Sequence, residues 1–509
     1  MNKENVIVLD FGGQYSHLIT RRIRDLSVYA ELLPYDKSAK EIESLNPLGI
    51  ILTGGPSSVY DDNSPKPDPK IFDLNIPILG ICYGLQIIVD NMGGSITRTD
   101  KREYGKATLS IPFEQKLFYG IGSKTDVWMS HGDATKILPD NFKSIASTEN
   151  SPYAAICSNN LYGVQFHPEV THTSDGTKIL KNFLYEICVC KGLWTMDSFV
   201  DSSINQIKSQ VENDSVLCAL SGGVDSSTVA LLLHKAIGDR LTCVFIDHGL
   251  LRKNEASDVL AMFDKLNIKI IFYNKSDRFL NLITDAIDPE IRRKLIGQEF
   301  IKVFEEISKQ NGPFKWLAQG TLYPDVIESA TTKGPAATIK THHNVGGLPE
   351  NLSFKLIEPL RELYKDEVRN VAKLIDLPVD ILKRHPFPGP GLSVRIIGKF
   401  TNEKLSICRD ASHIVEEELK KANLYDSVWQ AFAFVGDDQA VGVLGDGRKM
   451  GHIVTVRIVE STDAMTADWV KLPSDVLDNI STRITNEVDN VSWVTYAISS
   501  KPPSTIEPQ

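Results

Sequence analysis

Seven consecutive residues at 221–227 combine the flexibility and the hydrogen-bond donors that a phosphate site needs. An apolar run at 216–219 predicts a strand before them, and 228–233 predicts a helix after them. A glycine-rich turn placed there lets backbone N–H groups approach an anion, and the helix N-terminus adds positive potential. The turn lacks the Gly-Lys-Ser/Thr ending of the Walker loop. A plain structural turn is the alternative to the predicted phosphate site, which comprises Ser221, Gly222, Gly223, Val224, Asp225, Ser226 and Ser227.

A second reactive group is Cys82, which lies in the sequence Gly-Ile-Cys-Tyr-Gly at 80–84. This spacing matches the G-x-S-x-G nucleophile elbow, with sulfur in place of oxygen. The glycines permit a sharp turn between a strand at 78–81 and a helix from about Leu85. The N-terminus of that helix favours a thiolate. A buried structural cysteine is the alternative.

A base and a carboxylate for this cysteine are present further along the chain. His167 directly follows a predicted strand, and Glu169 lies two residues beyond it. A nucleophilic cysteine needs a base for its proton, and the base needs a carboxylate that fixes its orientation. Gly54 and Gly55 end another predicted strand, so their backbone could form an oxyanion hole with the N–H of Tyr83.

Together these elements resemble the class I glutamine amidotransferases, over about residues 1–191. The resemblance implies that Cys82 attacks the side-chain amide of glutamine, which gives a glutamyl thioester and ammonia. Water then releases glutamate. It also implies that glutamine is held by Gln86, Ser130, His131, Gly132 and Asp133.

The 221–227 loop resembles that of the ATP pyrophosphatases, which cleave ATP to AMP and pyrophosphate. A carboxylate beside phosphate is repulsive, so we expect Asp225 to help place Mg²⁺ with ATP as co-substrate. Residues 319–347 are similar to a mobile lid of the glutamine-hydrolysing GMP synthetase family. That similarity implies Mg²⁺ binding by two carboxylates and phosphate contacts nearby. The lid residues are Asp325, Glu328, Lys340, His342 and His343.

The adjacent histidines could instead form a zinc pair, but no third soft ligand lies nearby in the sequence. We expect neither zinc, nor flavin, nor NAD as a cofactor. Residues 384–392 and the tail at 501–507 also resemble the GMP synthetase family. The resemblance implies binding of xanthosine 5′-monophosphate (XMP), although two prolines after a lysine also suit a disordered terminus. The implied XMP residues are Arg292, Arg293, Gly389, Pro390, Lys501, Ile506 and Glu507.

Other classes of protein fit less well. A glutamine-dependent NAD synthetase shares the phosphate loop but normally uses a different glutaminase, and asparagine synthetase needs a cysteine where this chain has Asn2. RNA-thiolating relatives need catalytic cysteines at the ATP site, whereas Cys218 and Cys243 lie inside predicted strands. A catalytically silent binding protein would have lost a reactive residue, and each required residue is present.

Composition sets broad limits on the function. The chain has 509 residues, of which 42% are hydrophobic and 24% charged, as in ordinary globular proteins. A net charge of −10 argues against a general nucleic-acid partner. The sequence contains no apolar run of about 18 residues, so no membrane-spanning helix is predicted. The first residues lead directly into a predicted strand without a signal-peptide pattern, and the cysteines are few, so we expect a cytoplasmic protein without disulfides.

The elements that must position these residues alternate between strands and helices. This pattern predicts two α/β domains with doubly wound parallel sheets, at 1–191 and 192–384. Residues 385–509 predict a smaller α+β domain with the order β-α-β-β-α-β, whose first strand is expected near 392–397. The family resemblance implies a homodimer formed through this last domain.

Overall fold

The computed structural model describes residues 4–312, 314–330, 354–444, 447–461 and 466–509. The chain divides into two compact units, unit 1 at Met1–Phe199 and unit 2 at Val200–Gln509. The predicted class is confirmed, because both units contain parallel sheets with helices around them. Within the described residues, no helix has the length and apolar character needed to cross a membrane.

Unit 1 is built on a seven-stranded sheet. Its middle strands are short runs of Val, Ile and Leu that are buried on both faces, as is typical of parallel strands. In spatial order the strands are β2 (Tyr29–Pro34), β1 (Asn5–Asp10), β3 (Gly49–Leu52), β4 (Ile78–Ile81), β9 (Leu161–Val164), β8 (Ala155–Ser158) and β7 (Lys143–Ala146). The first five are parallel, β8 runs antiparallel to β9, and β7 runs antiparallel to β8.

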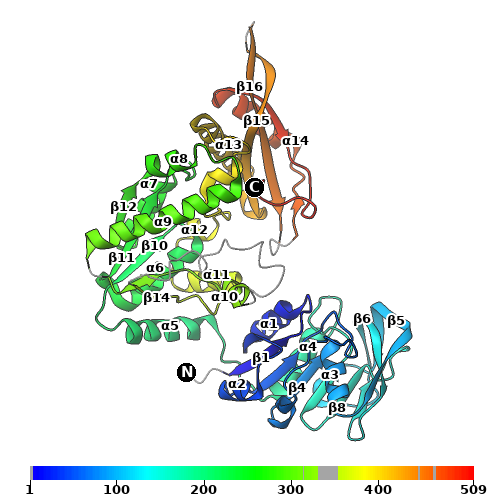
Figure 1. Cartoon of the computed structure of the whole chain (residues 1–509). Coiled ribbons are helices and arrows are strands. Elements are labelled where there is room, and N and C mark those ends of the chain that lie inside the picture. Colours follow the sequence, from blue (N-terminus) through cyan, green and yellow to red (C-terminus); the bar gives the residue numbers. More distant parts are fainter. Residues whose placement is uncertain (1–3, 313, 331–353, 445–446, 462–465) are drawn as a thin grey trace. The chain divides into compact units, whose positions relative to one another are not determined.

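Helices and one long hairpin complete unit 1 (Figure 1). The helices are α1 (Ser16–Asp25), α2 (Ala39–Ser44), α3 (Tyr83–Asn91) and α4 (Gly176–Asn182), and the hairpin is β5 (Ser95–Ser110) with β6 (Lys124–Ile137). In the sheet, Ile81 at the end of β4 pairs with Val164 at the end of β9. The turns that follow these two strands therefore meet at one edge of the sheet.

Unit 2 begins with a five-stranded parallel sheet in the order β12 (Ile270–Asn274), β11 (Leu241–Asp247), β10 (Val216–Leu220), β13 (Trp316–Ala318) and β14 (Lys355–Ile357). Its helices are α6 (Val224–Ile237), α7 (Glu255–Lys265), α8 (Ser276–Ile283), α9 (Pro289–Asn311), α10 (Tyr323–Ala330), α11 (Lys365–Leu374) and α12 (Val379–Leu382). Helix α5 (Met196–Val211) spans the boundary between the two units.

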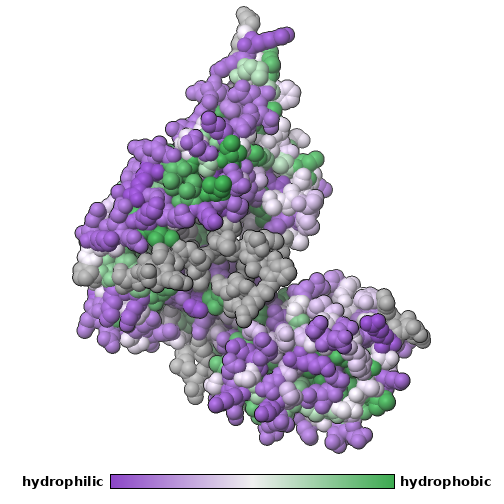
Figure 2. Space-filling view, in the orientation of Figure 1, coloured by the Kyte–Doolittle hydropathy of each residue, from purple (hydrophilic) through white to green (hydrophobic). Residues whose placement is uncertain are grey.

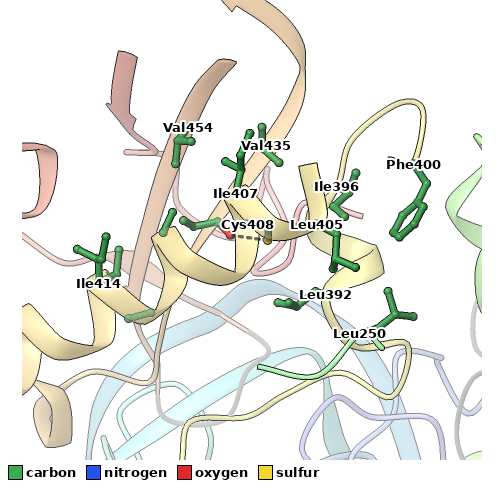
Figure 3. Packing of buried hydrophobic residues seen from close by; sticks show 14 of the residues in the cluster. Leu250, Leu392, Ile396, Phe400, Leu405, Ile407, Cys408, Ile414, Val435 and Val454 are labelled. Atoms are coloured by element: carbon green, nitrogen blue, oxygen red, sulfur yellow. Dashed lines mark hydrogen bonds between the residues drawn. The ribbon is translucent and has the colours of Figure 1, made fainter. Parts of the chain in front are cut away.

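The rest of unit 2 is a four-stranded sheet with two helices. The strands are β15 (Gln430–Leu444), β16 (Gly447–Glu460), β17 (Asp468–Trp469) and β18 (Val491–Tyr496), and the helices are α13 (Asn402–Lys421) and α14 (Ser474–Glu487). One hydrophobic cluster includes Leu250 after β11, Leu392, Leu405 on α13 and Val454 on β16 (Figure 3). Both sheets of unit 2 therefore share a core, and the expected boundary at residue 385 stays a prediction.

The prediction of a strand near 392–397 is wrong. Residues Gly391–Arg395 form a 3-10 helix, and only Ile396 pairs with a strand, through one bridge to Val435. Gly391 has a φ of +62°, and a side chain there would overlap the backbone of Leu250. This left-handed turn against the sheet ends the extended chain, although the apolar side chains suit a strand.

Candidate active sites

The nucleophile elbow is present in unit 1. Cys82 lies between β4 and α3 with φ of +53° and ψ of −102°, a conformation that is rare and strained for a residue with a side chain. A Cβ on Gly80 would overlap the backbone of Gly84, and a Cβ on Gly84 would overlap that of Leu52. Both flanking glycines are thus required by close backbone approach. Helix α3 begins at Tyr83, two residues before the predicted start, so its N-terminus is directly beside the cysteine.

His167 and Glu169 form a buried pair next to this elbow. The Nδ1 of His167 lies 2.7 Å from Oε1 of Glu169, and their side chains are 7% and 0% exposed. A Cβ on Gly54 would lie 3.2 Å from Cε1 of His167 and 3.8 Å from Cβ of Cys82, so the imidazole and the cysteine border the same small space.

The charge of this imidazole follows from its neighbours. Burial lowers the pKa of His167, but hydrogen-bonding and charge interactions with Cys82 and Glu169 outweigh burial and raise the pKa to about 10. A protonated imidazole beside a thiol stabilises the thiolate. The pair is therefore suited to nucleophilic attack at neutral pH.

Backbone donors are available where an oxyanion would form. Among the described residues, the N–H groups of Gly55 and Tyr83 have no hydrogen-bond acceptor. Tyr83 is the first residue of α3, so its N–H carries the positive end of the helix dipole. A Cβ on Gly13 would overlap the carbonyl of Gly54. The absence of a side chain at Gly13 therefore lets the loop after β1 lie close to the loop after β3. The arrangement fits the predicted oxyanion hole.

Strand β6 connects the predicted glutamine-holding residues with Cys82. Sγ of Cys82 lies 3.7 Å from the carbonyl oxygen of Ser130, and Nε2 of Gln86 donates to the carbonyl oxygen of Asp133 at 3.1 Å. His131 and Gly132 lie between these two carbonyls on β6. The structure thus places the 130–133 segment beside Cys82 at Ser130 and beside Gln86 at Asp133.

Sequence reasoning missed three residues at this site. Nε2 of Gln165 is 3.7 Å from Sγ of Cys82, and the ring of Tyr15 packs edge-on against His167 with centroids 5.3 Å apart. Gln165 could have been noticed as a buried amide between Val164 and Phe166 in an apolar stretch. The third residue, Glu103, contacts His131 and has no sequence motif.

In unit 2, residues 221–223 form the turn between β10 and α6, and residues 224–227 form the first turn of α6. Gly222 has a φ of +75°, and a Cβ there would lie 2.7 Å from Val259. The hydroxyl groups of Ser221 and Ser226 are 2.9 Å apart, and the N–H of Gly223 donates to Ser221 at 3.4 Å. Backbone N–H groups at the start of α6 can therefore face an anion.

Two basic side chains contact the 221–227 segment, one of them through Asp225. Oδ2 of Asp225 accepts a hydrogen bond from Lys365 at the start of α11, whereas Oδ1 is buried and has no partner in the described residues. Arg384 donates to the carbonyl oxygen of Gly222 at 3.3 Å. Neither Lys365 nor Arg384 was predicted, because both lie more than 130 residues from the loop in sequence.

The donor set fits Mg²⁺ that arrives with nucleotide. Within the described part of the chain, no three His, Cys, Asp or Glu side chains are grouped so that they could hold a metal ion. Mg²⁺ usually takes one or two carboxylates and completes its shell with phosphate oxygens and water. The unpartnered Oδ1 of Asp225 is a carboxylate oxygen that such a Mg²⁺ ion could take as a ligand.

The lid is described only in part. Oδ2 of Asp325 accepts from the N–H of Leu322 at 2.9 Å, which caps the start of α10. Glu328 lies on α10, but its side chain is outside the described residues, as are Lys340, His342 and His343. Their predicted roles remain predictions.

Comparison with known proteins adds the family. Residues 7–187 match the model "Glutamine amidotransferase class-I", 196–299 match "NAD synthase", and 417–508 match "GMP synthase C terminal domain". Proteins named "GMP synthase [glutamine-hydrolyzing]" from Gloeothece citriformis and Thermosynechococcus vestitus are each 52% identical over 517 residues. These matches cover 100% of this chain and 95% and 97% of the relatives.

The chain belongs to the glutamine-hydrolysing GMP synthase family. The two sites described above fall within separate matched regions of this family. Cys82, His167 and Glu169 lie in the amidotransferase region, and the 221–227 turn lies in the region shared with NAD synthase. A glutamine-dependent NAD synthetase is no longer an alternative, because the full-length relatives are GMP synthases.

Of the two arginines predicted to contact XMP, Arg292 is buried and fully engaged. Its guanidinium donates to the carbonyl oxygens of Ala286 at 2.6 Å, Ser393 at 3.2 Å and Ile396 at 2.7 Å, and also to Gly398. These bonds fasten α9 to the 3-10 helix at 391–395. Burial lowers the pKa of Arg292. The neighbouring Arg293 pairs with Glu290 and the backbone oxygen of Gln509.

The tail of the chain is fixed rather than extended into solvent. Arg457 on β16 donates to the carbonyl oxygens of Ser499, Thr505 and Ile506 at 3.1, 2.8 and 2.9 Å. Lys501 exchanges two backbone hydrogen bonds with Ala467. These bonds hold the predicted XMP residues Lys501 and Ile506 against the four-stranded sheet.

Glu507 forms the strongest contact of the tail. Its carboxylate accepts two bonds from Arg395, at 3.1 and 2.9 Å, and one from Gln430 at 2.5 Å. The Arg395 side chain is 2% exposed and also packs over Phe432. Gly389 and Pro390 immediately precede the 3-10 helix, and a Cβ on Gly389 would meet no atom within 4 Å. Gln430 also donates to Pro386 at 3.1 Å and so joins the tail to the Pro-Gly segment.

Proposed function

We propose that this chain makes GMP from XMP, with glutamine as the nitrogen donor and ATP as the activating co-substrate. The observation that carries the proposal is that one chain contains a strained thiol elbow with its own base and, in a separate compact unit, a glycine-rich turn at a helix N-terminus. The first arrangement liberates ammonia and the second activates a carbonyl group. Membership of the GMP synthase family supports this combination.

In unit 1, the Cys82 thiolate attacks the amide carbon of glutamine. The developing oxyanion accepts hydrogen bonds from the N–H groups of Gly55 and Tyr83. His167, held by Glu169 at 2.7 Å, gives its proton to the leaving nitrogen, so ammonia departs and a thioester forms. Water then attacks the thioester while His167 accepts a proton, and glutamate and the thiolate are released.

In unit 2, the carbonyl oxygen at C2 of XMP attacks the α-phosphorus of ATP, and the bond to pyrophosphate breaks. The backbone N–H groups at the start of α6, together with Ser221 and Ser226, are placed to hold the phosphates. Mg²⁺ bound with ATP would neutralise the charge on the leaving pyrophosphate, and Asp225 would contribute an oxygen ligand. Ammonia then attacks C2, AMP leaves, and GMP is formed.

The tail and the Pro-Gly segment are proposed to bind XMP. Among the two arginines, Arg293 is the better phosphate candidate, because the donors of Arg292 already bind carbonyl oxygens inside the unit. Lys501 is held by Ala467, and Glu507 is held by Arg395. Their proposed roles are contacts to phosphate and to ribose or base. We infer that the enzyme acts in the cytoplasm on free nucleotides.

We further propose a homodimer formed through the C-terminal sheet. The hairpin of β15 and β16 extends beyond the rest of unit 2 (Figure 1), while hydrophilic residues cover most of the visible face of that unit (Figure 2). Near the hairpin, four apolar side chains are at least half exposed: Val441, Val443, Met450 and Trp493. A cluster of this kind favours a protein contact. Sedimentation of the unaltered chain and of Val443→Glu tests the proposal. The unaltered chain should be a dimer and the variant a monomer, and a variant that stays dimeric would contradict the proposal.

Pyrophosphate release tests the proposed reaction directly. MgATP alone should release none, whereas MgATP with XMP should release pyrophosphate even without a nitrogen donor. Replacing XMP by IMP or GMP provides the acceptor control, because neither has the carbonyl oxygen at C2. Release that is independent of XMP would contradict the proposed acceptor.

A further inference from the structure

A buried carboxylate lies behind the glutamine side of the Cys82 site. Glu103 on β5 is paired in register with His131 on β6, and their side chains are 8% and 2% exposed. Oε2 of Glu103 lies 3.3 Å from Nε2 of His131. The steps proposed above give Glu103 no part, and a carboxylate is rarely buried without a specific partner.

Glu103 is tied to a third segment of unit 1. The hydroxyl of Thr148 donates to Oε1 at 2.9 Å and to Oε2 at 3.2 Å, and the same hydroxyl accepts from the N–H of Ser151 at 3.0 Å. The carboxylate is therefore held on one side by the loop after β7 and on the other by His131. Its orientation is fixed by hydrogen bonds from both directions.

The ring of His131 is held at both nitrogens. Nδ1 lies 3.0 Å from the carbonyl oxygen of Asp133, and a carbonyl can only accept, so Nδ1 carries a proton. The contact between Nε2 and Glu103 needs one further proton, because an unprotonated ring nitrogen and a carboxylate can both only accept. Burial lowers the pKa of His131, while the charge of Glu103 raises it. Removal of Glu103 would leave Nε2 buried without a partner.

The segment fixed by this ring touches the nucleophile and a glutamine-site residue. The carbonyl of Ser130, directly before His131, lies 3.7 Å from Sγ of Cys82. The carbonyl of Asp133 accepts from both His131 and Gln86. A shift of the imidazole would therefore move the carbonyl beside Sγ of Cys82 and the carbonyl that binds Gln86.

We propose that Glu103 is a positioning residue of the glutaminase site, which sets the 130–133 segment through His131. The inference rests on the proposed glutaminase role of Cys82. Glu103 does not touch the substrate and does not act on Cys82 directly. A buried ion pair is weak support for stability alone, because desolvation offsets its attraction. The network therefore has its main effect on the geometry of the site.

The test compares Glu103→Ala, Glu103→Gln and Thr148→Val in the full-length enzyme. Glu103→Ala should raise the KM for glutamine about tenfold or more while kcat changes much less, because one charged hydrogen bond is lost from a positioning contact. Glu103→Gln can still bond Nε2 and should recover most of the affinity. Thr148→Val should have an intermediate effect.

Ammonia as the nitrogen donor separates positioning from folding. Ammonia-dependent GMP synthesis should remain unchanged in all three variants. Glu149→Ala, an exposed glutamate beside Thr148, is the matched control and should leave KM unaltered. An unchanged KM in Glu103→Ala would overturn the inference. So would an equal loss of glutamine- and ammonia-dependent synthesis, or a failure of Glu103→Gln to improve on Glu103→Ala.

The inference and the proposed function can fail separately. If Cys82→Ala keeps glutamine-dependent synthesis, the glutaminase assignment fails whatever Glu103 does. If Cys82→Ala loses that synthesis while Glu103→Ala keeps its KM, only the positioning role fails.

Discussion

The two candidate sites are built in different ways. In unit 1, the nucleophile and its base follow neighbouring strands β4 and β9, and the carboxylate lies two residues beyond the base. In unit 2, the phosphate turn is equally local, but the groups around it come from far along the chain. Lys365 reaches Asp225 across 140 residues, and Arg384 reaches Gly222 across 162.

This difference shows how two kinds of chemistry use one type of fold. Covalent chemistry on a small amide needs few groups in fixed positions, which one edge of a parallel sheet supplies. Joining two large nucleotides needs charge at several points, and arginines and lysines from distant segments provide it. The first site should therefore fail through single reactive residues. The second should fail through loss of charge or of long-range contacts.

The largest effect should come from Cys82→Ala. Glutamine-dependent GMP formation should fall by roughly 10⁴-fold or more, because no other group can form the thioester. Synthesis from ammonium salts should be unchanged, since the activation site is in unit 2. The measurement is GMP formation with each nitrogen donor. Cys157→Ala, on β8 of the same unit, is the matched control. An equal loss with both donors would break the separation between the two sites.

Asp225→Asn tests the other side of the comparison. Both nitrogen donors should support synthesis roughly 10²–10³-fold more slowly, because the carboxylate proposed to meet phosphate-bound Mg²⁺ is neutralised while its shape is kept. XMP-dependent pyrophosphate release should fall in proportion, and glutamine hydrolysis should persist. Asp239→Asn, an exposed aspartate beyond the far end of α6, provides the control. Normal turnover with ammonia would remove Asp225 from the mechanism.

The same contrast explains what sequence could and could not predict. The glycine-rich turn, the elbow and the pairing of His167 with Glu169 were predictable because each is a short pattern at the end of a strand. Glu103 and the burial of Arg292 were not, since their meaning depends on contacts with His131 and Ser393 that only folding creates. The apolar residues at 392–397 suggested a strand, but the left-handed turn at Gly391 overrode that preference.

The pH dependence of Cys82 reactivity sharpens the picture of unit 1. The pKa of His167 is raised to about 10, so its imidazole stays protonated below that pH and keeps a positive charge beside Cys82. Alkylation of Cys82 by iodoacetamide, followed by peptide mass spectrometry, should then vary little between pH 7 and 9. In His167→Ala the rate should rise about tenfold per pH unit up to roughly pH 8.5, as for an ordinary thiol.

The same samples contain an internal reference for this measurement. Burial raises the pKa of Cys157, so its labelling should increase with pH in both proteins. A steep increase for Cys82 in the unaltered enzyme would contradict a preformed thiolate. It would also place the activation of the nucleophile after glutamine binding.

The smallest expected effect tests the long-range contacts of unit 2. Glu507→Gln keeps the size of the side chain but leaves the buried guanidinium of Arg395 without a counter-charge, which costs more than losing an exposed ion pair. The tail should loosen, and the KM for XMP should rise about tenfold with a smaller change in kcat. Glu460→Gln, exposed at the end of β16, should have no effect. Because the glutaminase residues lie in unit 1, glutamine hydrolysis without XMP should be the same in both variants. An unchanged KM in Glu507→Gln would mean that the tail is fixed for stability alone and that XMP is held by other residues of unit 2.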